Sequence, residues 1–182
     1  MQRTLILIGA ACTFLLVACA ARQPAPESPH DLLLLPPDEI TNEILLQQKL
    51  TLLANGQEQH FLAVARLERD RIRLLLFAPS GQQLLALNFD GELLHQRNAP
   101  GFDVPGKEIL ASLQFALWPV DSIRRHYQQD DGWDIEIDKR GRSLLTSSGP
   151  LLIIRQDSEK VWLDNLQRKY RVIIETLEQR EL

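Results

Sequence analysis

Residues 71–89 read RIRLLLFAPSGQQLLALNF, and this stretch decides the fold. In its first half, Leu74 and Leu76 alternate with Arg73, a period of two that is typical of a strand with one buried face. Residues 79–81, Pro-Ser-Gly, predict a turn, because proline and glycine supply the backbone angles that turns require. The second half returns with the same alternation, so the stretch predicts two antiparallel strands joined by a short turn.

The same period of two recurs on both sides of this hairpin. Asn55-Gly56 is a strong hairpin signal, because a type I′ turn requires positive φ at both central positions. Runs with strand-like alternation and short connections indicate about ten antiparallel strands. They cover residues 44–52, 61–67, 72–78, 83–89, 92–97, 133–138, 142–147, 151–155, 160–166 and 169–178.

One helical segment interrupts the strands. Residues 107–118 carry apolar side chains at helical spacing, and Pro119 ends this predicted helix. Asp121 or Ser122 is expected to cap a second, short helix. A curled sheet covered by helices on one face predicts a mainly β domain over residues 32–182. We expect an incomplete antiparallel barrel, in meander order, with a short helical lid.

Composition excludes several classes of protein. The chain has 182 residues, a formal net charge of −4 and 45% hydrophobic residues. A nucleic-acid-binding domain needs a basic face, so this charge argues against one. The histidines His30, His60, His95 and His126 have no partners at metal-ligand spacing, and His126 is expected on the solvated surface. Because the usual nucleophile, phosphate-loop and dinucleotide motifs are missing, we expect no enzymatic activity, no metal and no cofactor.

The first 18 residues predict a lipoprotein signal peptide. Arg3 provides a positive start, and residues 5–17 form a charge-free, mainly apolar run. This run is shorter than the ~20 apolar residues of a membrane span but fits the core of a signal peptide. It ends in Leu16-Val17-Ala18-Cys19, which resembles the bacterial lipobox.

The lipobox resemblance implies cleavage after Ala18 and lipidation of Cys19. The alternative is an ordinary signal peptide cut after Ala20 or Ala21. Residues 19–31 are rich in alanine, proline, glutamate and serine, and predict a flexible tether behind the lipidated cysteine. Position 20 lacks the aspartate that retains enterobacterial lipoproteins in the inner membrane. The resemblance therefore implies an outer-membrane lipoprotein whose domain faces the periplasm.

Two stretches resemble the outer-membrane lipoprotein acceptor family LolB and its periplasmic carrier relative LolA. Residues 71–87 resemble the third and fourth strands of that family around a Pro-x-Gly turn, and residues 117–124, LWPVDSIR, resemble its helix break. The resemblance implies a helical lid over a hydrophobic cavity that holds acyl chains. The acceptor carries a membrane-inserting leucine where this chain has Ser80, so the resemblance favours cavity binding over direct delivery into a bilayer.

The chain is similar, more closely still, to an uncharacterised proteobacterial lipoprotein family often encoded in aryl polyene gene clusters. The stretches that carry this likeness are residues 45–51 (LLQQKLT), 117–119 (LWP) and 170–177 (YRVIIETL). This second resemblance implies that the cavity takes acyl or polyene chains from a soluble carrier.

Leucine is the most frequent residue, whereas aromatic residues make up only 6% of the chain. So much leucine either fills a core or lines a hydrophobic cavity. Trp118, at the helix break before Pro119, either packs in the core or touches a ligand. The expected cavity-lining residues are Leu74, Leu76, Leu85, Leu87, Ile109, Leu113, Leu117 and Trp118.

Two functions from different classes follow from these patterns. The leading hypothesis is a monomeric, non-enzymatic outer-membrane lipoprotein that binds acyl chains or lipidated cargo, received from a periplasmic carrier protein. The alternative is a structural accessory lipoprotein with a filled core, which recruits a partner through its surface. A hydrolase with an unrecognised site is a weaker third possibility.

Overall fold

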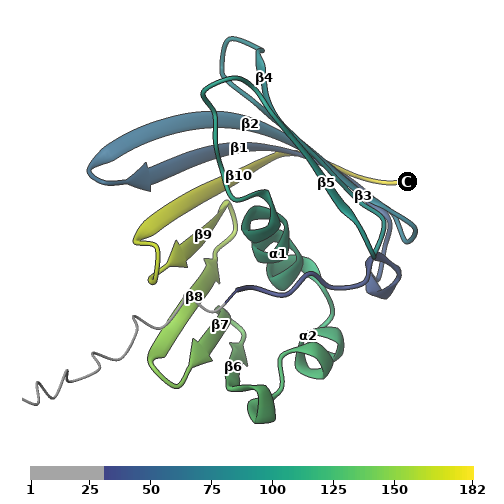
Figure 1. Cartoon of the computed structure of the whole chain (residues 1–182), viewed down its shortest axis with the longest axis vertical. Helices are drawn as coiled ribbons and strands as arrows, with labels where there is room; N and C mark the ends of the chain where they lie inside the picture. The colour runs from purple at the N-terminus through teal and green to yellow at the C-terminus, as the bar shows by residue number, and fades with distance from the viewer. Residues whose placement is uncertain (1–30) are drawn as a thin grey trace, which may run out of the picture.

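A strongly curved antiparallel sheet wraps around two helices that lie on its concave side (Figure 1). This computed structural model describes residues 31–182. The helices and 3-10 turns are η1 (Pro37–Glu39), α1 (Gly106–Leu117), α2 (Val120–His126) and η2 (Gln129–Asp131). The strands are β1 (Ile44–Ala54), β2 (Gln57–Leu67), β3 (Ile72–Phe77), β4 (Gln83–Phe89), β5 (Leu94–Asn98), β6 (Trp133–Asp138), β7 (Gly141–Thr146), β8 (Gly149–Gln156), β9 (Lys160–Asn165) and β10 (Tyr170–Glu181).

The ten strands form one sheet in the order β5-β4-β3-β2-β1-β10-β9-β8-β7-β6. It consists of two five-stranded meanders, joined because β1 pairs with β10 along its whole length, from Ile44 opposite Glu181 to Ala54 opposite Tyr170. Strands β5 and β6 are the two edges, and the chain passes between them through α1 and α2. The predicted mainly β, incomplete barrel with a helical lid is therefore confirmed, with two meanders in place of a single one.

Tight turns connect the strands of this sheet, and bulges within the strands bend it. Asn55 has a φ of 51° and Gly56 a φ of 72°, which confirms the predicted hairpin between β1 and β2. The β1–β10 register shifts between Gln47 and Gln48, and similar irregularities occur in the β3–β4 and β7–β8 pairs. Such bulges bend and twist a strand, which lets the sheet curl around its helices.

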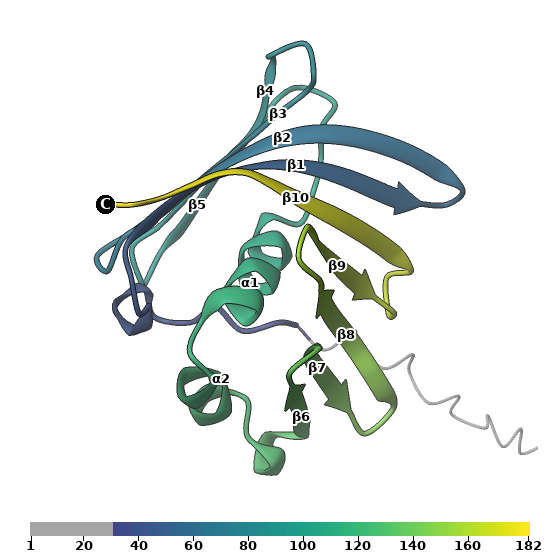
Figure 2. The ribbon, with the colours of Figure 1, turned by 180° about the vertical axis from the view of Figure 1, so that it is seen from behind.

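The segment that precedes β1, residues 31–40, runs along the helices on the concave side and is called the strap from here on (Figures 1 and 2). Its residues Leu32–Leu35 belong to no strand and are tucked against the domain. Leu32, Leu35 and Ile40 are buried in the common core. The strap is thus part of the packed fold and does not extend freely from it.

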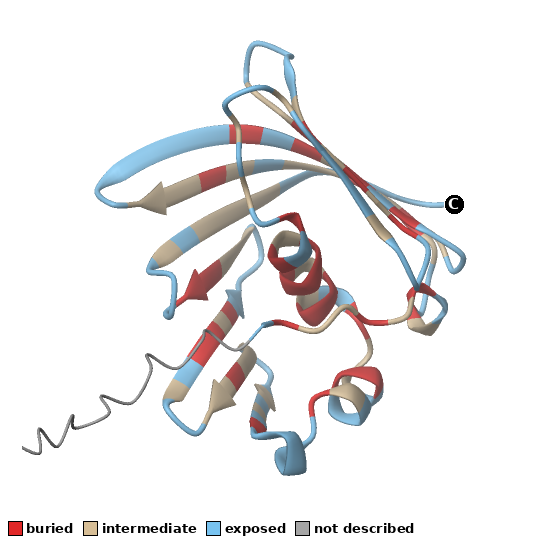
Figure 3. Ribbon diagram, in the orientation of Figure 1, coloured by how far each residue is buried: buried red, intermediate tan, exposed pale blue. Residues whose placement is uncertain are grey.

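Burial is concentrated on the concave side, in α1, the strap and the inward faces of the strands (Figure 3). The predicted signal peptide, the lipidated Cys19 and residues 19–30 of the predicted tether lie outside the described residues. Within residues 31–182, neither helix has the length and apolar character needed to cross a membrane.

Candidate functional site

Helix α1 is the centre of the candidate site, because its faces meet different parts of the molecule. Gln114 and Trp118 hydrogen-bond the strap. Glu108 faces β9 and β10, where it accepts hydrogen bonds from Asn165 and Tyr170. Since successive helical residues are 100° apart, a third face of α1 lies opposite the strap. This face is directed towards the middle of the sheet, β1, β2 and β10 (Figures 1 and 2).

The face of α1 that points to the middle of the sheet carries apolar side chains that stay only half-buried. It includes Ile109 and Leu113. The inward side chains of β1 and β10 opposite this face are also apolar and half-buried. We call the combined set the concave apolar surface; its members are Leu50, Leu52, Ile109, Leu113, Val172 and Ile174.

This partial exposure is unusual for the inner face of a curved sheet, where side chains are normally close-packed. Elsewhere on the same inner face, Leu46, Leu74 and Leu85 are at most 5% exposed. The concave apolar surface therefore differs from the packed core that surrounds it. Half-buried apolar side chains favour contact with an apolar partner, because that contact removes their remaining apolar surface from water, which lowers the free energy.

The eight residues expected to line a cavity occupy three different environments. Leu74, Leu76, Leu85 and Leu87, on β3 and β4, belong to the packed core. Ile109 and Leu113 belong to the concave apolar surface. Leu117 is 38% exposed at the end of α1, and Trp118 is fully buried, with its indole N–H donating to the carbonyl oxygen of Pro36 at 2.9 Å. Their part in ligand binding stays a prediction.

The four strand residues of the concave apolar surface are not among those expected from the sequence to line a cavity. Leu50 and Leu52 share one face of β1, and Val172 and Ile174 share one face of β10. Their alternation was visible in the sequence. The pairing of the first strand with the last, which brings them together, was not.

Gln114 of α1 and Tyr127, the residue directly after α2, bind the strap backbone, each with a donor and an acceptor. The amide of Gln114 accepts from the Leu35 N–H at 2.9 Å and donates to the Leu35 carbonyl at 2.5 Å. The Tyr127 hydroxyl accepts from the Leu33 N–H at 3.0 Å and donates to the Leu33 carbonyl at 3.2 Å. Burial raises the pKa of Tyr127 to about 12, despite its hydrogen bond with Leu33, so this hydroxyl stays protonated at neutral pH.

A cluster of polar side chains fastens the other end of the strap to α2. Glu39 accepts a hydrogen bond from Ser122 and forms ion pairs with Arg125 and His126, each at 3.2 Å. Burial acts to raise the pKa of Glu39, but these three partners outweigh it and hold the pKa below its usual value of 4.5. The expectation that Asp121 or Ser122 caps α2 is wrong, because α2 begins after Pro119 and Ser122 bonds the strap.

His126 likewise departs from the sequence expectation. It was expected on the solvated surface, but it is half-buried against Glu39. Its carboxylate partner, Glu39, comes from the strap, and no local sequence pattern near His126 indicates that the strap lies beside α2.

The C-terminal end of α1 is held by a residue from the opposite meander. Arg142 of β7 donates from Nη1 to the carbonyl oxygens of Phe115 and Trp118, at 2.9 and 2.7 Å. Cations stabilise the carbonyl ends of helices, where backbone acceptors lack intrahelical partners. Burial lowers the pKa of Arg142 from its ordinary value, yet an arginine remains charged at any physiological pH.

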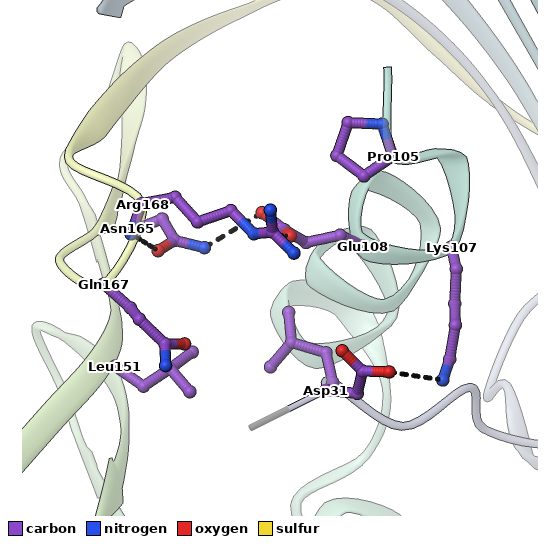
Figure 4. A pocket seen from close by; sticks show the side chains of 9 residues that line it. Asp31, Pro105, Lys107, Glu108, Leu151, Asn165, Gln167 and Arg168 are labelled. Carbon is purple, nitrogen blue, oxygen red and sulfur yellow. Dashed lines mark hydrogen bonds and ion pairs between the residues drawn. The ribbon is translucent and has the colours of Figure 1, made fainter. Parts of the chain in front are cut away.

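A small polar pocket of about 190 Å³ lies beside the N-terminal turn of α1 (Figure 4). Its walls come from the strap, the start of α1, β8 and the β9–β10 turn. At its inner end Glu108, 9% exposed, accepts hydrogen bonds from Asn165 at 3.1 Å and Tyr170 at 2.8 Å, and pairs with Arg168. Burial and the Glu108 carboxylate raise the pKa of Tyr170, which keeps this hydroxyl a donor.

The described residues contain no group of three or more histidine, cysteine, aspartate or glutamate side chains arranged to hold a metal ion. The polar groups that the fold does assemble, around Glu39 and Glu108, pair carboxylates with cations and neutral donors. Both clusters therefore fasten elements of the fold together.

The domain is thus an incomplete antiparallel barrel, in which a curved sheet of two meanders covers a helix and the strap. The chain belongs to the DUF3261 family, described as proteins of unknown function, whose family model matches residues 45–178. No curated protein matches the chain.

Several solved structures are distantly similar. The crystal structure of MucB shows 14% identity and a TM-score of 0.37 over 80% of this chain, which spans 55% of the MucB chain. A putative outer membrane lipoprotein-sorting protein domain from Vibrio parahaemolyticus shows 11% identity and a TM-score of 0.37, covering 80% of this chain and 87% of that one. A DUF1329 family protein from Desulfovibrio piger shows 8% identity and a TM-score of 0.34, covering 78% and 86%.

Proposed function

We propose that this protein is an outer-membrane-anchored, non-enzymatic lipoprotein that binds an acyl or polyene chain between helix α1 and strands β1 and β10. The observation that carries the proposal is the concave apolar surface, whose side chains are only half-buried beside a core that is packed. An extended hydrocarbon chain would cover these side chains and remove their apolar area from water. Burial of this kind contributes about 25 cal/mol per Å².

The proposed role is that of an acceptor or carrier in lipid or lipoprotein transport, with a soluble periplasmic carrier as the donor. The sequence resemblance to the lipoprotein acceptors, and to lipoproteins of aryl polyene gene clusters, supports this choice of ligand class. The lipobox at Cys19 supports the location, since several acyl chains make a lasting anchor whereas one does not.

Two measurements test the binding proposal. The full chain, expressed with its own signal peptide, is purified in a mild detergent and analysed by native mass spectrometry for co-purifying lipid. Displacement of an apolar fluorophore then measures occupancy in solution.

A matched pair of variants locates the site. Leu113→Trp enlarges a side chain of the concave apolar surface where the ligand is proposed to lie, so we expect a folded protein that binds the fluorophore at least tenfold more weakly. Leu93→Trp adds the same side chain just before β5, at an exposed position outside the proposed site, and should leave binding unchanged. If both variants bind the fluorophore as the parent does, the ligand does not lie along this face of α1.

The second candidate function is a structural accessory lipoprotein that recruits a partner through its surface. The observation in its favour is the close packing of Leu74, Leu85 and Trp118, together with a strap that occupies one side of α1. An unmodified chain that binds no apolar fluorophore, and carries no lipid from cells, would favour this second function.

A further inference from the structure

The polar pocket beside α1 combines charges of both signs on opposite walls. Arg168 and Gln167 reach into it from the β9–β10 turn, while Asp31 and Lys107 line the other side (Figure 4). With Glu108, the lining holds two carboxylates and two cations, so its net charge is zero. Such a lining favours neither a free anion nor a free cation, but it can neutralise a ligand that carries both charges.

The two ion pairs of the pocket, Glu108–Arg168 and Asp31–Lys107, differ in how firmly they are held. Glu108 is saturated by Asn165, Tyr170 and the Nε of Arg168, so it holds the Arg168 guanidinium in position. The side chains of Asp31 and Lys107 are well exposed, and the Lys107 Nζ lies 3.6 Å from the Asp31 Oδ2. An exposed ion pair of this kind contributes little to stability. Among the described residues, no hydrogen bond engages the side-chain amide of Gln167, which leaves it available to a ligand.

Size narrows the class of ligand further. A volume of about 190 Å³ holds roughly six water molecules and is below the 300–1,000 Å³ of typical small-molecule sites. It therefore suits a polar head group and excludes an entire lipid. Leu32 and Leu151 supply an apolar portion of the wall, against which the C–H groups of such a head group can pack.

We propose that this pocket binds a zwitterionic ammonium–phosphodiester head group, as found in phosphatidylethanolamine. The phosphodiester accepts hydrogen bonds from Arg168 and Gln167, and the primary ammonium pairs with Asp31. The pocket lies within reach of a bilayer, because Asp31 is twelve residues after the predicted lipid anchor, a chain length of at most about 40 Å. This site is separate from the concave apolar surface, so either can fail without the other.

Calorimetric titration of the mature lipoprotein in non-ionic detergent tests the proposal with three soluble probes. We expect glycerophosphoethanolamine to bind at least tenfold more tightly than glycerophosphocholine, whose quaternary ammonium cannot donate to Asp31, or glycerophosphoglycerol, which has no cation. Equal affinity for all three probes, or binding of none, would overturn the proposal.

Two variants connect the binding to the named residues. Asp31→Asn should remove the preference for the ethanolamine probe, whereas Asp38→Asn, an exposed carboxylate elsewhere on the strap, should preserve it. Arg168→Lys, which keeps the charge beside Glu108, should weaken all phosphodiester probes by losing the planar donor group. An unchanged preference in Asp31→Asn would refute the assignment of the ammonium.

Hydrogen exchange distinguishes a bilayer lipid from a free head group as the source. The lipoprotein is reconstituted in vesicles of phosphatidylethanolamine or of phosphatidylcholine. If bilayer lipid fills the pocket, the amides of residues 165–170 exchange several-fold more slowly in phosphatidylethanolamine, and Asp31→Asn abolishes the difference. If only the soluble probe binds, exchange is equal in both vesicles, and the ligand is a free glycerophosphodiester.

Discussion

Gln114 shows how one buried polar side chain can position a segment 79 residues away. Its amide is fully buried and pairs with both backbone groups of Leu35, as a neighbouring strand would. A buried backbone group without a partner costs about 1–3 kcal/mol, so this pairing lets the strap lie in the core without belonging to the sheet.

Removing that amide should therefore destabilise the whole domain. We expect Gln114→Ala to lower the free energy of unfolding by about 2–4 kcal/mol, because two buried backbone groups lose their partner. Urea denaturation followed by tryptophan fluorescence measures the change. Gln57→Ala, at an exposed position of β2, is the matched control and should change stability by less than about 0.5 kcal/mol. A similar loss in both variants would show that the strap does not depend on Gln114.

Glu39 makes the attachment of the strap to α2 dependent on pH. Its pKa in the folded protein is lowered from 4.5 by Ser122, His126 and Arg125, which outweigh the opposing effect of burial. The stabilisation is therefore complete above pH 4.5, and it is lost as the pH falls through the lowered pKa. We expect Glu39→Gln to be less stable than the parent at neutral pH and to lose less stability as the pH falls below 4.5.

Denaturation curves at several pH values check this prediction. Asp38→Asn removes an exposed carboxylate from the same turn and is the control for general charge effects. Parallel stability profiles for the parent and Glu39→Gln would contradict the proposed role of Glu39.

At the scale of elements, helix α1 is attached to the rest of the fold at both of its ends and along one side. Arg142 holds its C-terminal carbonyls, Glu108 connects its first turn to β9 and β10, and Gln114 connects it to the strap. These anchors lie away from the face that carries Ile109 and Leu113. The helix can therefore keep that face half-buried without losing its position, which is the condition that the proposed ligand site needs.

The turn between β3 and β4, which projects at the top of Figure 1, is the second element of interest. Ser80 is exposed there, in the position where the lipoprotein acceptors carry a leucine. We expect Ser80→Leu, in a Cys19→Ala background, to increase association with liposomes, since a buried leucine contributes about 1.5–3 kcal/mol. Flotation of the two proteins with liposomes measures the gain.

A second exposed turn provides the control for this substitution. Ser147→Leu places the same side chain between β7 and β8 and should give a smaller gain. An equal gain at both turns would mean that the β3–β4 turn has no special orientation towards the membrane.

At the scale of the whole molecule, attachment to the membrane is predicted to depend on one residue outside the described part of the chain. The lipobox resemblance implies acyl chains on Cys19, and several acyl chains together make a lasting membrane anchor. We therefore expect Cys19→Ala to abolish attachment of the mature domain to the outer membrane. Membrane fractionation with a salt wash measures this, and Ala20→Ser is the control that keeps the cysteine. A Cys19→Ala protein that stays in the outer-membrane fraction would contradict the lipobox prediction.

The sequence by itself determined the local elements of this fold. Alternating apolar residues marked the strands, Asn55-Gly56 marked a hairpin and Pro119 marked the end of α1. These signals are local, because strand and helix periods and the backbone angles of turns depend on residues within a few positions of each other. The mainly β class with one helical interruption followed from them.

Only the tertiary structure decided which elements meet. The pairing of β1 with β10, and the course of the strap along α1 and α2, join residues about 80 to 140 positions apart. No local period encodes such contacts, since many alternative pairings of strands would satisfy the same alternation. The concave apolar surface exists only because that pairing sets Leu50 beside Ile174. The polar pocket likewise exists only because the strap brings Asp31 opposite Arg168.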